Sequence, residues 1–300
     1  MATVARVAAP AFWRNKLNLD EFDISKPFYG RVLSTERLTP HEATEVRHIE
    51  IEVDHDEAAF EPGHSIGLLL PGPHAYGHKN HLRLYSLANI EYGPHGKPIL
   101  GICVRRLFYV DEYSGESYPG LASNYLCDVP SGQKLTLTGP YGMPFPVPGD
   151  SAAPLIMVGL GVGIAPFRAL LREIYRERGA WSGPVRLFHG ARTGLELLYH
   201  NDHKNDFAQY YDEETFQAIK ALSPEPHLDE PVPIAQKLAE HVYGVWELLK
   251  DPRAHLYVAG SEHVEHTLEK AFQHMAGGLK PWTEKKTAMQ ADGRYAELLY

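Results

Sequence analysis

The sequence predicts a two-domain protein in which an antiparallel β-barrel precedes an α/β domain with a doubly wound parallel sheet. In the first half, short runs of strand-forming residues alternate with turn residues, as in small barrels. After Asp150, apolar runs alternate with helical patterns instead. A proline-rich stretch at 144–149 separates the two textures. We therefore expect an N-terminal extension over 1–26, a barrel domain over 27–148 and an α/β domain over 149–300.

Each predicted element follows from a local pattern of this kind. The barrel strands are expected at 30–33, 46–53, 65–70, 82–88, 99–105 and 134–138. The α/β domain is expected to begin with a buried strand at 155–158 and an amphipathic helix at 165–178. Further strands are expected at 185–189 and 255–259, helices near 234–249 and 264–275, and a loop at 223–233.

The composition excludes several classes of protein. The chain has 300 residues, 44% hydrophobic and 22% charged, as in soluble globular proteins. A net charge of −9 argues against nonspecific nucleic-acid binding. No apolar stretch reaches the roughly 18 residues of a membrane helix, and the N-terminus lacks the pattern of a secretory signal. Two isolated cysteines, Cys103 and Cys127, predict neither a zinc site nor a disulfide framework, so a reducing cytoplasm is expected.

Two short features indicate nucleotide binding. Arg83 and Tyr85 alternate along a strand-like segment and would share one face, where a cation can hold a phosphate and a ring can stack on a flat ligand. The glycine turn 161–166 follows an apolar run and precedes a helical pattern, a setting in which backbone amides hold a pyrophosphate. Taken alone, each feature also fits an ordinary barrel strand or α/β turn. Together they suggest that electrons pass between two cofactors.

With the residues around these two features, the chain resembles the plant-type ferredoxin–NADP(H) reductase family as a divergent member. The resemblance extends from about Pro27 to Tyr300 and implies an FAD-binding barrel followed by a pyridine-nucleotide domain. It is carried by the segments 61–67 (EPGHSIG), 83–86 (RLYS), 103–109 (CVRRLFY), 120–128 (GLASNYLCD), 137–140 (LTGP) and 163–168 (GIAPFR) and by the aromatic C-terminus.

The resemblance assigns roles around the flavin. Arg83 would pair with the FAD pyrophosphate, Tyr85 would stack on the isoalloxazine, and Ser86 would donate a hydrogen bond near its N5 atom. Tyr109 would stack on the adenine, and Tyr300 would cover the other flavin face until nicotinamide displaces it. The same matching adds Cys103, Val104, Arg105, Ala122, Ser123 and Asn124 to the FAD-binding residues.

On the pyridine-nucleotide side, the resemblance implies binding by residues at several turns and makes Glu265 a catalytic-site residue together with Ser86 and Tyr300. The chain departs from the family here, because Leu160 and Val162 replace hydroxyl-bearing threonines and Ala259 replaces a cysteine that positions nicotinamide. The implied binding residues are Gly161, Val162, Gly163, Pro166, Arg192, Ser223 and Gly260.

A second departure concerns the choice of coenzyme. NADPH-specific members carry Ser-Arg and then Lys-x-Tyr around the 2′-phosphate, whereas this chain reads Ser223-Pro224-Glu225 and lacks the Arg and the Tyr. The carboxylate of Glu225 would repel a 2′-phosphate but can accept from a ribose hydroxyl. This favours NADH or weak use of either nucleotide. Arg105 or Arg192 could restore phosphate binding, although Arg192 also fits an ordinary exposed charge.

Histidines at 74, 78, 81, 200 and 203 suggest a metal site at first sight. Their loop spacing, without cysteines or a matching set of carboxylates, is more typical of solvated side chains, so no metal is predicted.

The leading interpretation is an FAD-dependent oxidoreductase that transfers hydride and electrons between NADPH or NADH and a one-electron carrier such as ferredoxin or flavodoxin. One alternative is the reductase component of an oxygenase system. Another is a flavin-binding subunit or redox-sensing module with little pyridine-nucleotide activity. The coenzyme preference, the identity of the carrier, the physiological direction and the oligomeric state stay open.

Overall fold

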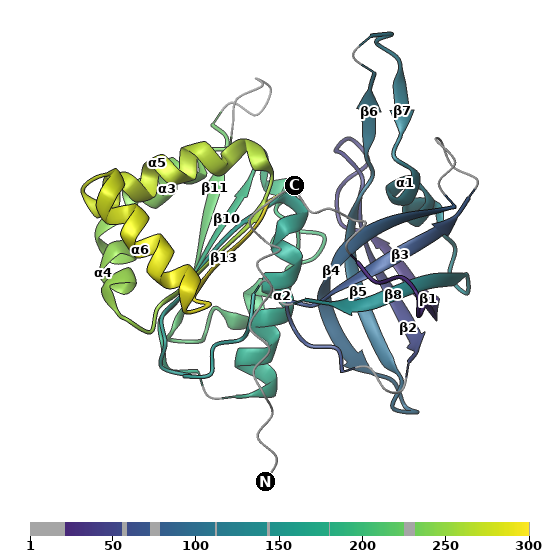
Figure 1. Ribbon diagram of the computed structural model, residues 1–300, viewed down its shortest axis with the longest axis horizontal. Helices are drawn as coiled ribbons and strands as arrows, with labels where there is room; N and C mark the ends of the chain where they lie inside the picture. The colour runs from purple at the N-terminus through teal and green to yellow at the C-terminus, as the bar shows by residue number, and fades with distance from the viewer. Residues whose placement is uncertain are drawn as a thin grey trace.

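A barrel and a parallel sheet lie side by side in the computed structural model, as Figure 1 shows. The structure describes residues 22–55, 59–72, 79–111, 113–142, 145–179, 181–224 and 232–299. Both halves of the predicted fold class are confirmed.

The barrel is closed, with strand order β1-β2-β5-β4-β3-β8 and antiparallel pairing throughout. Alternate residues of these strands point inward, and the interior is filled by branched side chains such as Val32, Ile51 and Leu100. All six predicted strands are present. Their bounds are β1 (Phe28–Arg37), β2 (Val46–Asp54), β3 (Ser65–Pro71), β4 (Asn80–Tyr92), β5 (Pro98–Arg105) and β8 (Lys134–Tyr141).

A short hairpin and a helix lie between β5 and β8. The hairpin strands β6 (Phe108–Val110) and β7 (Ser117–Pro119) project from the barrel, and α1 (Leu121–Asp128) follows at their base (Figure 1). The helix packs against β4 and β5, burying Ala122 and Leu126 in the barrel's apolar cluster. The hairpin was not predicted, because strands of three residues are too short to show a periodic pattern.

The second half contains a five-stranded parallel sheet with the order β11-β10-β9-β12-β13. The chain builds outward from β9 to β11, then crosses to β12 on the other side of β9. The topological switch point, where ligands of such sheets bind, therefore lies at the carboxyl end of β9. The bounds are β9 (Leu155–Leu160), β10 (Val185–Ala191), β11 (Phe216–Leu222), β12 (His255–Gly260) and β13 (Tyr295–Leu299). The edge strands β11 and β13 were not predicted.

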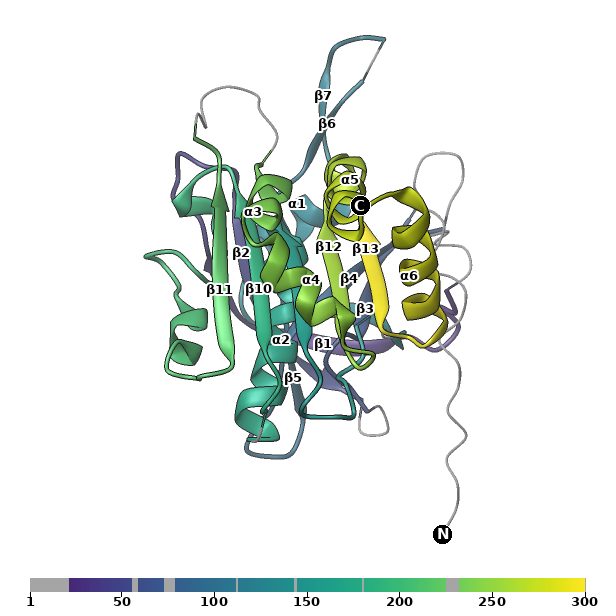
Figure 2. The ribbon, with the colours of Figure 1, turned by 90° about the vertical axis from the view of Figure 1, so that its left-hand side faces the viewer.

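Helices cover both faces of this sheet (Figure 2). One face packs on α2 and the barrel, and the other packs on α3 to α6. The α-helices are α2 (Ala165–Arg172), α3 (Ile234–Glu240), α4 (Val242–Lys250), α5 (Glu265–Ala276) and α6 (Leu279–Ala291). Single 3₁₀ turns occur at Gly161–Ile164, Gly194–Glu196, Asp206–Tyr210 and Glu262–Val264. No helix in the described segments is long and apolar enough to cross a membrane.

Two predicted helices differ in detail from the observed ones. The helix expected over 165–178 is α-helical only to Arg172 and continues as a π-turn, in which the Arg178 amide donates to the Glu173 carbonyl at 2.9 Å. The helix expected near 234–249 is two helices, because His241, with φ −106° and ψ 16°, interrupts the regular geometry. The third predicted helix, at 264–275, corresponds to α5, whereas α6 was not predicted.

The barrel and the sheet share one apolar cluster along the seam between them. Leu38, Val46 and Ala88 of the barrel pack with Phe167 and Tyr199 of the second half. The last barrel strand ends at Tyr141 and the first sheet strand begins at Leu155, so the expected boundary at 148/149 lies in the connection between them.

Candidate functional site

The strand β4 places the predicted flavin residues on the outer wall of the barrel. Arg83 is exposed, and its Nη1 donates to the carbonyl of Leu82 at 3.1 Å. Tyr85 is half-buried and packs on the apolar cluster that includes Ala122 and Cys127 from α1. The structure thus brings an exposed cationic fork and an anchored aromatic ring to one strand.

Ser86 follows at a point where the strand changes its course. It lies opposite Ser65 on β3, with their hydroxyl oxygens 3.4 Å apart. The pairing of β4 with β5 shifts between Leu87 and Asn89, which is a β-bulge directly after Ser86. Bulges bend a strand and re-aim its side chains, often beside active sites. The hydroxyl of Ser86 therefore sits beside a local distortion of the wall.

The hairpin carries an exposed apolar surface. Tyr109 is 59% exposed and stacks on Tyr118, with ring centroids 5.5 Å apart and planes inclined by 24°. Phe108, Val110 and Leu121 beside them are also more than half exposed. An apolar surface of this kind on a soluble protein marks a binding site for a flat or apolar group. The sequence missed Tyr118, whose strand is only three residues long.

The polar side chains at the start of α1 bond the chain that precedes the helix. The helix begins at Leu121 after the N-cap Gly120, so Ser123 and Asn124 are its third and fourth residues. Their side chains bond within the protein: the Ser123 hydroxyl accepts from the Leu107 amide at 3.2 Å, and the Asn124 amide group donates to the Leu107 carbonyl at 2.8 Å. The donors left to a ligand are the backbone N–H groups of the first turn.

Arg106 holds this helix in place, a role that the sequence did not reveal. Its guanidinium binds Glu45 at 2.7 Å, Asp128 at 2.6 Å and the side-chain oxygen of Asn124 at 3.0 Å. Hydrogen bonds to these two carboxylates raise the pKa of Arg106 further above its usual range. The network joins Glu45, just before β2, to the middle and the last residue of α1 and fixes the direction of the helix.

The three predicted residues at the end of β5 have three different environments. Cys103 is buried in the seam, and burial raises the pKa of its thiol to about 12. Val104 points into the barrel cluster, and Arg105 is exposed. Both Cys103 and Cys127 are free thiols.

The glycine turn lies at the switch point of the sheet. The run Gly161–Ile164 follows β9 as a 3₁₀ turn and leads into α2, with Pro166 in its first turn. A side chain at Gly163 would collide with the neighbouring strand, because its Cβ would lie 2.5 Å from the carbonyl carbon of Ala259 and 2.7 Å from the amide of Gly260. Only glycine allows so close an approach of the turn to β12.

The other predicted nucleotide residues gather at the same edge, since parallel strands present their carboxyl ends together. Arg192 follows β10 and is exposed, and Gly260 ends β12 with φ +146°. Ser223 follows β11, and its buried hydroxyl has no hydrogen-bond partner among the described residues. Glu265 is exposed at the start of α5, just beyond β12. Glu225 lies outside the described residues.

The last strand ends beside this edge. Leu299 pairs with Gly260, so the chain leaves β13 next to the glycine turn, while Tyr300 itself lies outside the described residues. A half-buried charge network holds the strand: Lys286 lies 3.4 Å from Glu297, which also accepts from the Tyr295 hydroxyl at 2.7 Å. Glu297 was not singled out from the sequence.

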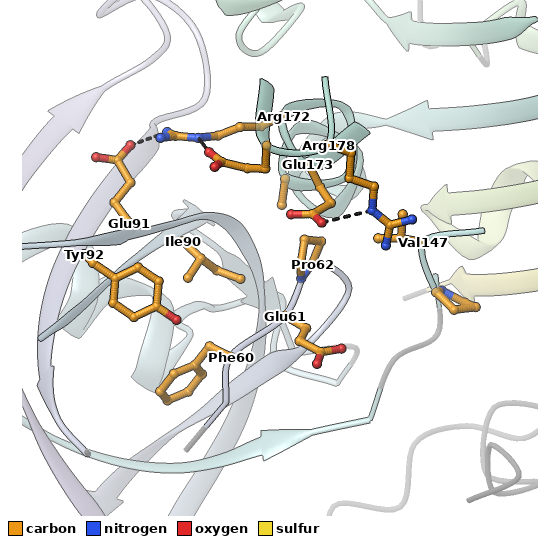
Figure 3. Close-up of a pocket in the computed structure, with 13 residues that line it drawn as sticks. Phe60, Glu61, Pro62, Ile90, Glu91, Tyr92, Val147, Arg172, Glu173 and Arg178 are labelled. Atoms are coloured by element: carbon orange, nitrogen blue, oxygen red, sulfur yellow. Dashed lines mark hydrogen bonds and ion pairs between the residues drawn. The ribbon is translucent and has the colours of Figure 1, made fainter. Parts of the chain in front are cut away.

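A cavity of about 650 Å³ opens elsewhere along the seam, lined partly by the end of β4 and by the π-turn (Figure 3). Ion pairs cross it or flank it, including Arg172 with Glu91 and Arg178 with Glu173. None of the predicted cofactor residues lines this cavity.

Metal binding finds no support in the described segments, which contain no group of three or more residues able to hold an ion. Three of the five histidines considered from the sequence, His81, His200 and His203, lie in these segments. The Nε2 atom of His200 forms a hydrogen bond with the Tyr211 hydroxyl. His74 and His78 lie outside the described residues.

Comparison with known proteins matches this geometry to a family. Residues 157–270 match the family model described as an oxidoreductase NAD-binding domain. The chain is 30% identical over 277 residues to a ferredoxin–NADP reductase from Spirulina sp., covering 90% of this chain and 94% of that protein. The chain belongs to the ferredoxin–NADP reductase family. The protein is therefore an oxidoreductase, and it belongs to the plant-type family that the resemblance implied.

Other members of the reductase family support the same assignment. A ferredoxin–NADP reductase from Synechocystis sp. is 31% identical over 277 residues, which are 90% of this chain but 66% of that protein. The chloroplastic enzyme of Spinacia oleracea is 30% identical over 285 residues, covering 91% and 75%. In fold, a mutant ferredoxin–NADP+ reductase from Plasmodium falciparum, solved in complex with 2′P-AMP, matches with a TM-score of 0.71 at 15% identity, covering 93% of this chain and 98% of that one.

The cofactors of a reductase fit the observed surfaces. The exposed aromatic surface of the hairpin suits the adenine of FAD, and the solvent-facing fork of Arg83 suits its pyrophosphate. The close glycine turn suits a pyridine nucleotide, NADP or NAD, at the sheet edge, and so does the hydroxyl of Ser223, which has no hydrogen-bond partner in the described part of the chain.

Proposed function

We propose that the protein is an FAD-dependent reductase that moves electrons between NADPH or NADH and a one-electron carrier such as ferredoxin or flavodoxin. One observation carries the proposal. Arg168, in the first turn of the helix that follows the glycine turn, donates to the Ala88 carbonyl at 3.0 Å, two residues beyond Ser86. A hydrogen bond therefore connects the two candidate nucleotide sites across the seam between the barrel and the sheet. Hydride transfer requires that two bound cofactors be held in a fixed relative position.

On the flavin side, each residue has a role that its position allows. FAD, when bound, supplies a ring that accepts two electrons together and releases them singly. Tyr85 presents its ring for stacking, and Arg83 pairs with the pyrophosphate. Ser86 donates a hydrogen bond at the ring edge where hydride arrives. The first-turn amides of α1 add donors for phosphate, and Tyr109 stacks on the adenine.

On the coenzyme side, the backbone does most of the binding. The amides of Gly161–Gly163 and the start of α2 hold the pyrophosphate, because Leu160 and Val162 carry no hydroxyl groups. Ser223 offers its buried hydroxyl to the ribose, and Arg192 adds a positive charge at the same edge. Glu265 would position the nicotinamide, and Tyr300 would compete with it for the flavin face, as the family resemblance implies.

The proposed partner is a separate carrier protein met in the cytoplasm. Two buried, unpaired cysteines are consistent with a reducing compartment. With a net charge of −9, long-range attraction of an acidic ferredoxin is weak, so we expect association to depend on a local surface rather than on the overall charge.

The proposal is tested with the FAD-loaded protein in a cytochrome c reduction assay driven by NADPH or NADH. Ferredoxin and flavodoxin are added in turn. Cytochrome reduction that depends on both a coenzyme and a carrier supports a reductase. Tight FAD binding with no coenzyme-dependent turnover would instead identify a flavin-binding module, and turnover that neither carrier accelerates would point to an oxygenase component with its own carrier.

A further inference from the structure

Tyr199 has a backbone conformation that tyrosine rarely adopts. Its φ is 59°, and among the described residues it is the one non-glycine residue with positive φ. Its side chain is fully buried. A left-handed backbone conformation is unfavourable at a bulky residue and persists only where the surrounding contacts determine it. The contacts around Tyr199 therefore hold its backbone in this conformation.

The ring of Tyr199 crosses from the second half of the chain into the wall of the barrel. Its hydroxyl lies 2.9 Å from Nδ1 of His48 on β2, and the two rings meet edge to face with centroids 5.7 Å apart. His48 lies directly opposite Cys103 on β5, which faces the same hydroxyl. Burial lowers the pKa of His48 to about 3, so the imidazole is neutral and the contact is a hydrogen bond between two neutral groups.

Arg168 covers the other side of the same ring. Its guanidinium carbon lies 4.9 Å from the centroid of the Tyr199 ring. From there it donates to the Ala88 carbonyl at 3.0 Å and to the side-chain oxygen of Asn89 at 2.9 Å, both on β4. The Nε of Arg168 also donates to the carboxylate of Asp206 at 2.7 Å. The absence of a side chain at Gly101 makes room for Asn89, because a Cβ there would lie 1.9 Å from the Asn89 oxygen.

These contacts connect the two candidate nucleotide sites through one side chain. Arg168 belongs to the helix that starts at the glycine turn, and Ala88 and Asn89 belong to the strand that carries Tyr85 and Ser86. Tyr199 contacts Arg168 through its ring and His48 on β2 through its hydroxyl, and it belongs to the same apolar cluster as Ala88. We propose that Tyr199 is a positioning residue for hydride transfer, which sets the separation between the coenzyme edge of the sheet and the flavin strand. This inference rests on the proposed function.

The test compares Tyr199→Phe with Tyr175→Phe in the FAD-loaded protein. Tyr199→Phe keeps the buried ring and its contact with Arg168 but removes the bond to His48. Tyr175 is a matched control, since it is a buried phenol of the same half whose hydroxyl bonds Thr215 at 2.8 Å without crossing the seam. The rate constant of flavin reduction at saturating coenzyme, the dissociation constant of the coenzyme and the FAD content are measured for both.

We expect Tyr199→Phe to keep its FAD and its coenzyme affinity within about threefold while the reduction rate constant falls roughly tenfold, because hydride transfer is sensitive to sub-ångström misplacement. In Tyr175→Phe, the coenzyme is expected to reduce the flavin at the wild-type rate. Amide hydrogen exchange should also rise at Ala88 and in the first turn of α2 in Tyr199→Phe alone. Equal rates and equal exchange in the two variants would overturn the positioning role. A wild-type protein that neither coenzyme reduces would instead overturn the proposed function.

Discussion

The substitution Gly163→Ala tests whether the glycine turn is held against β12. The added Cβ would lie 2.5 Å, 2.6 Å and 2.7 Å from the carbonyl carbon and oxygen of Ala259 and the amide nitrogen of Gly260. These are backbone atoms of a strand paired on both sides, so they cannot rotate away as a side chain would. Restoring ordinary contact distances requires a displacement of about 1 Å, and overpacking of this kind costs about 1–3 kcal/mol.

The assay measures stability and coenzyme reduction on the same variant. Urea unfolding of the FAD-loaded protein should show the loss of stability, and the rate of flavin reduction should fall about 100-fold, because the turn is displaced by about 1 Å from the pyrophosphate. The control is Gly244→Ala, at an exposed position of α4, where the same methyl meets nothing within 4 Å. Replacing a helical glycine there should stabilise by about 0.5–1 kcal/mol. Wild-type stability and wild-type reduction in Gly163→Ala would refute the reasoning.

Three further predictions concern the flavin, the C-terminus and the buried side chain of His48. Tyr85→Ala should lose FAD while Tyr85→Phe keeps it, measured as bound flavin per chain after gel filtration; full retention of FAD in Tyr85→Ala would exclude the stacking role. Tyr300→Ser should keep FAD and bind coenzyme more tightly, as measured by difference titration, whereas unchanged affinity would mean that the terminal ring does not compete with nicotinamide. For pH, burial, with Arg168 and Lys204 nearby, lowers the pKa of His48 from 6.5 to about 3, so between these values the unfolded chain binds a proton that the folded protein does not. His48 should therefore contribute its full stabilisation above pH 6.5 and lose about 2 kcal/mol of it by pH 5. Urea midpoints that are the same at pH 7 and pH 5 would contradict this.

The sequence was sufficient for the elements whose patterns are local. The first barrel strand alternates buried and exposed residues along its first half, and the first sheet strand is a continuous apolar run ending in a glycine turn. The same locality places Arg83 and Tyr85 on one strand and the glycine turn at the switch point. Gly163 illustrates the limit, because the turn is visible in the sequence but the strand it approaches, β12, lies nearly 100 residues later.

The parts that the sequence did not predict depend on contacts between distant residues. The pair His48–Tyr199 joins residues 151 positions apart, and the unusual φ of Tyr199 has no signature in the amino acids around it. The stacked pair Tyr109–Tyr118 sits in strands too short for a periodic pattern. The bonds that the side chains of Ser123 and Asn124 make to Leu107 also escaped the sequence, since they join residues 16 and 17 positions apart.

The most direct test of the account is anaerobic stopped-flow reduction of the FAD-loaded protein by NADPH and NADH in parallel. We predict that at least one coenzyme reduces the flavin completely within seconds, seen as the loss of its yellow absorbance. The observed rate constant should saturate as the coenzyme concentration rises. The preferred coenzyme would show whether the edge around Ser223 and Arg192 accepts a 2′-phosphate. A flavin spectrum that stays oxidised with both coenzymes would contradict the central claim that the two connected sites form one hydride-transfer path.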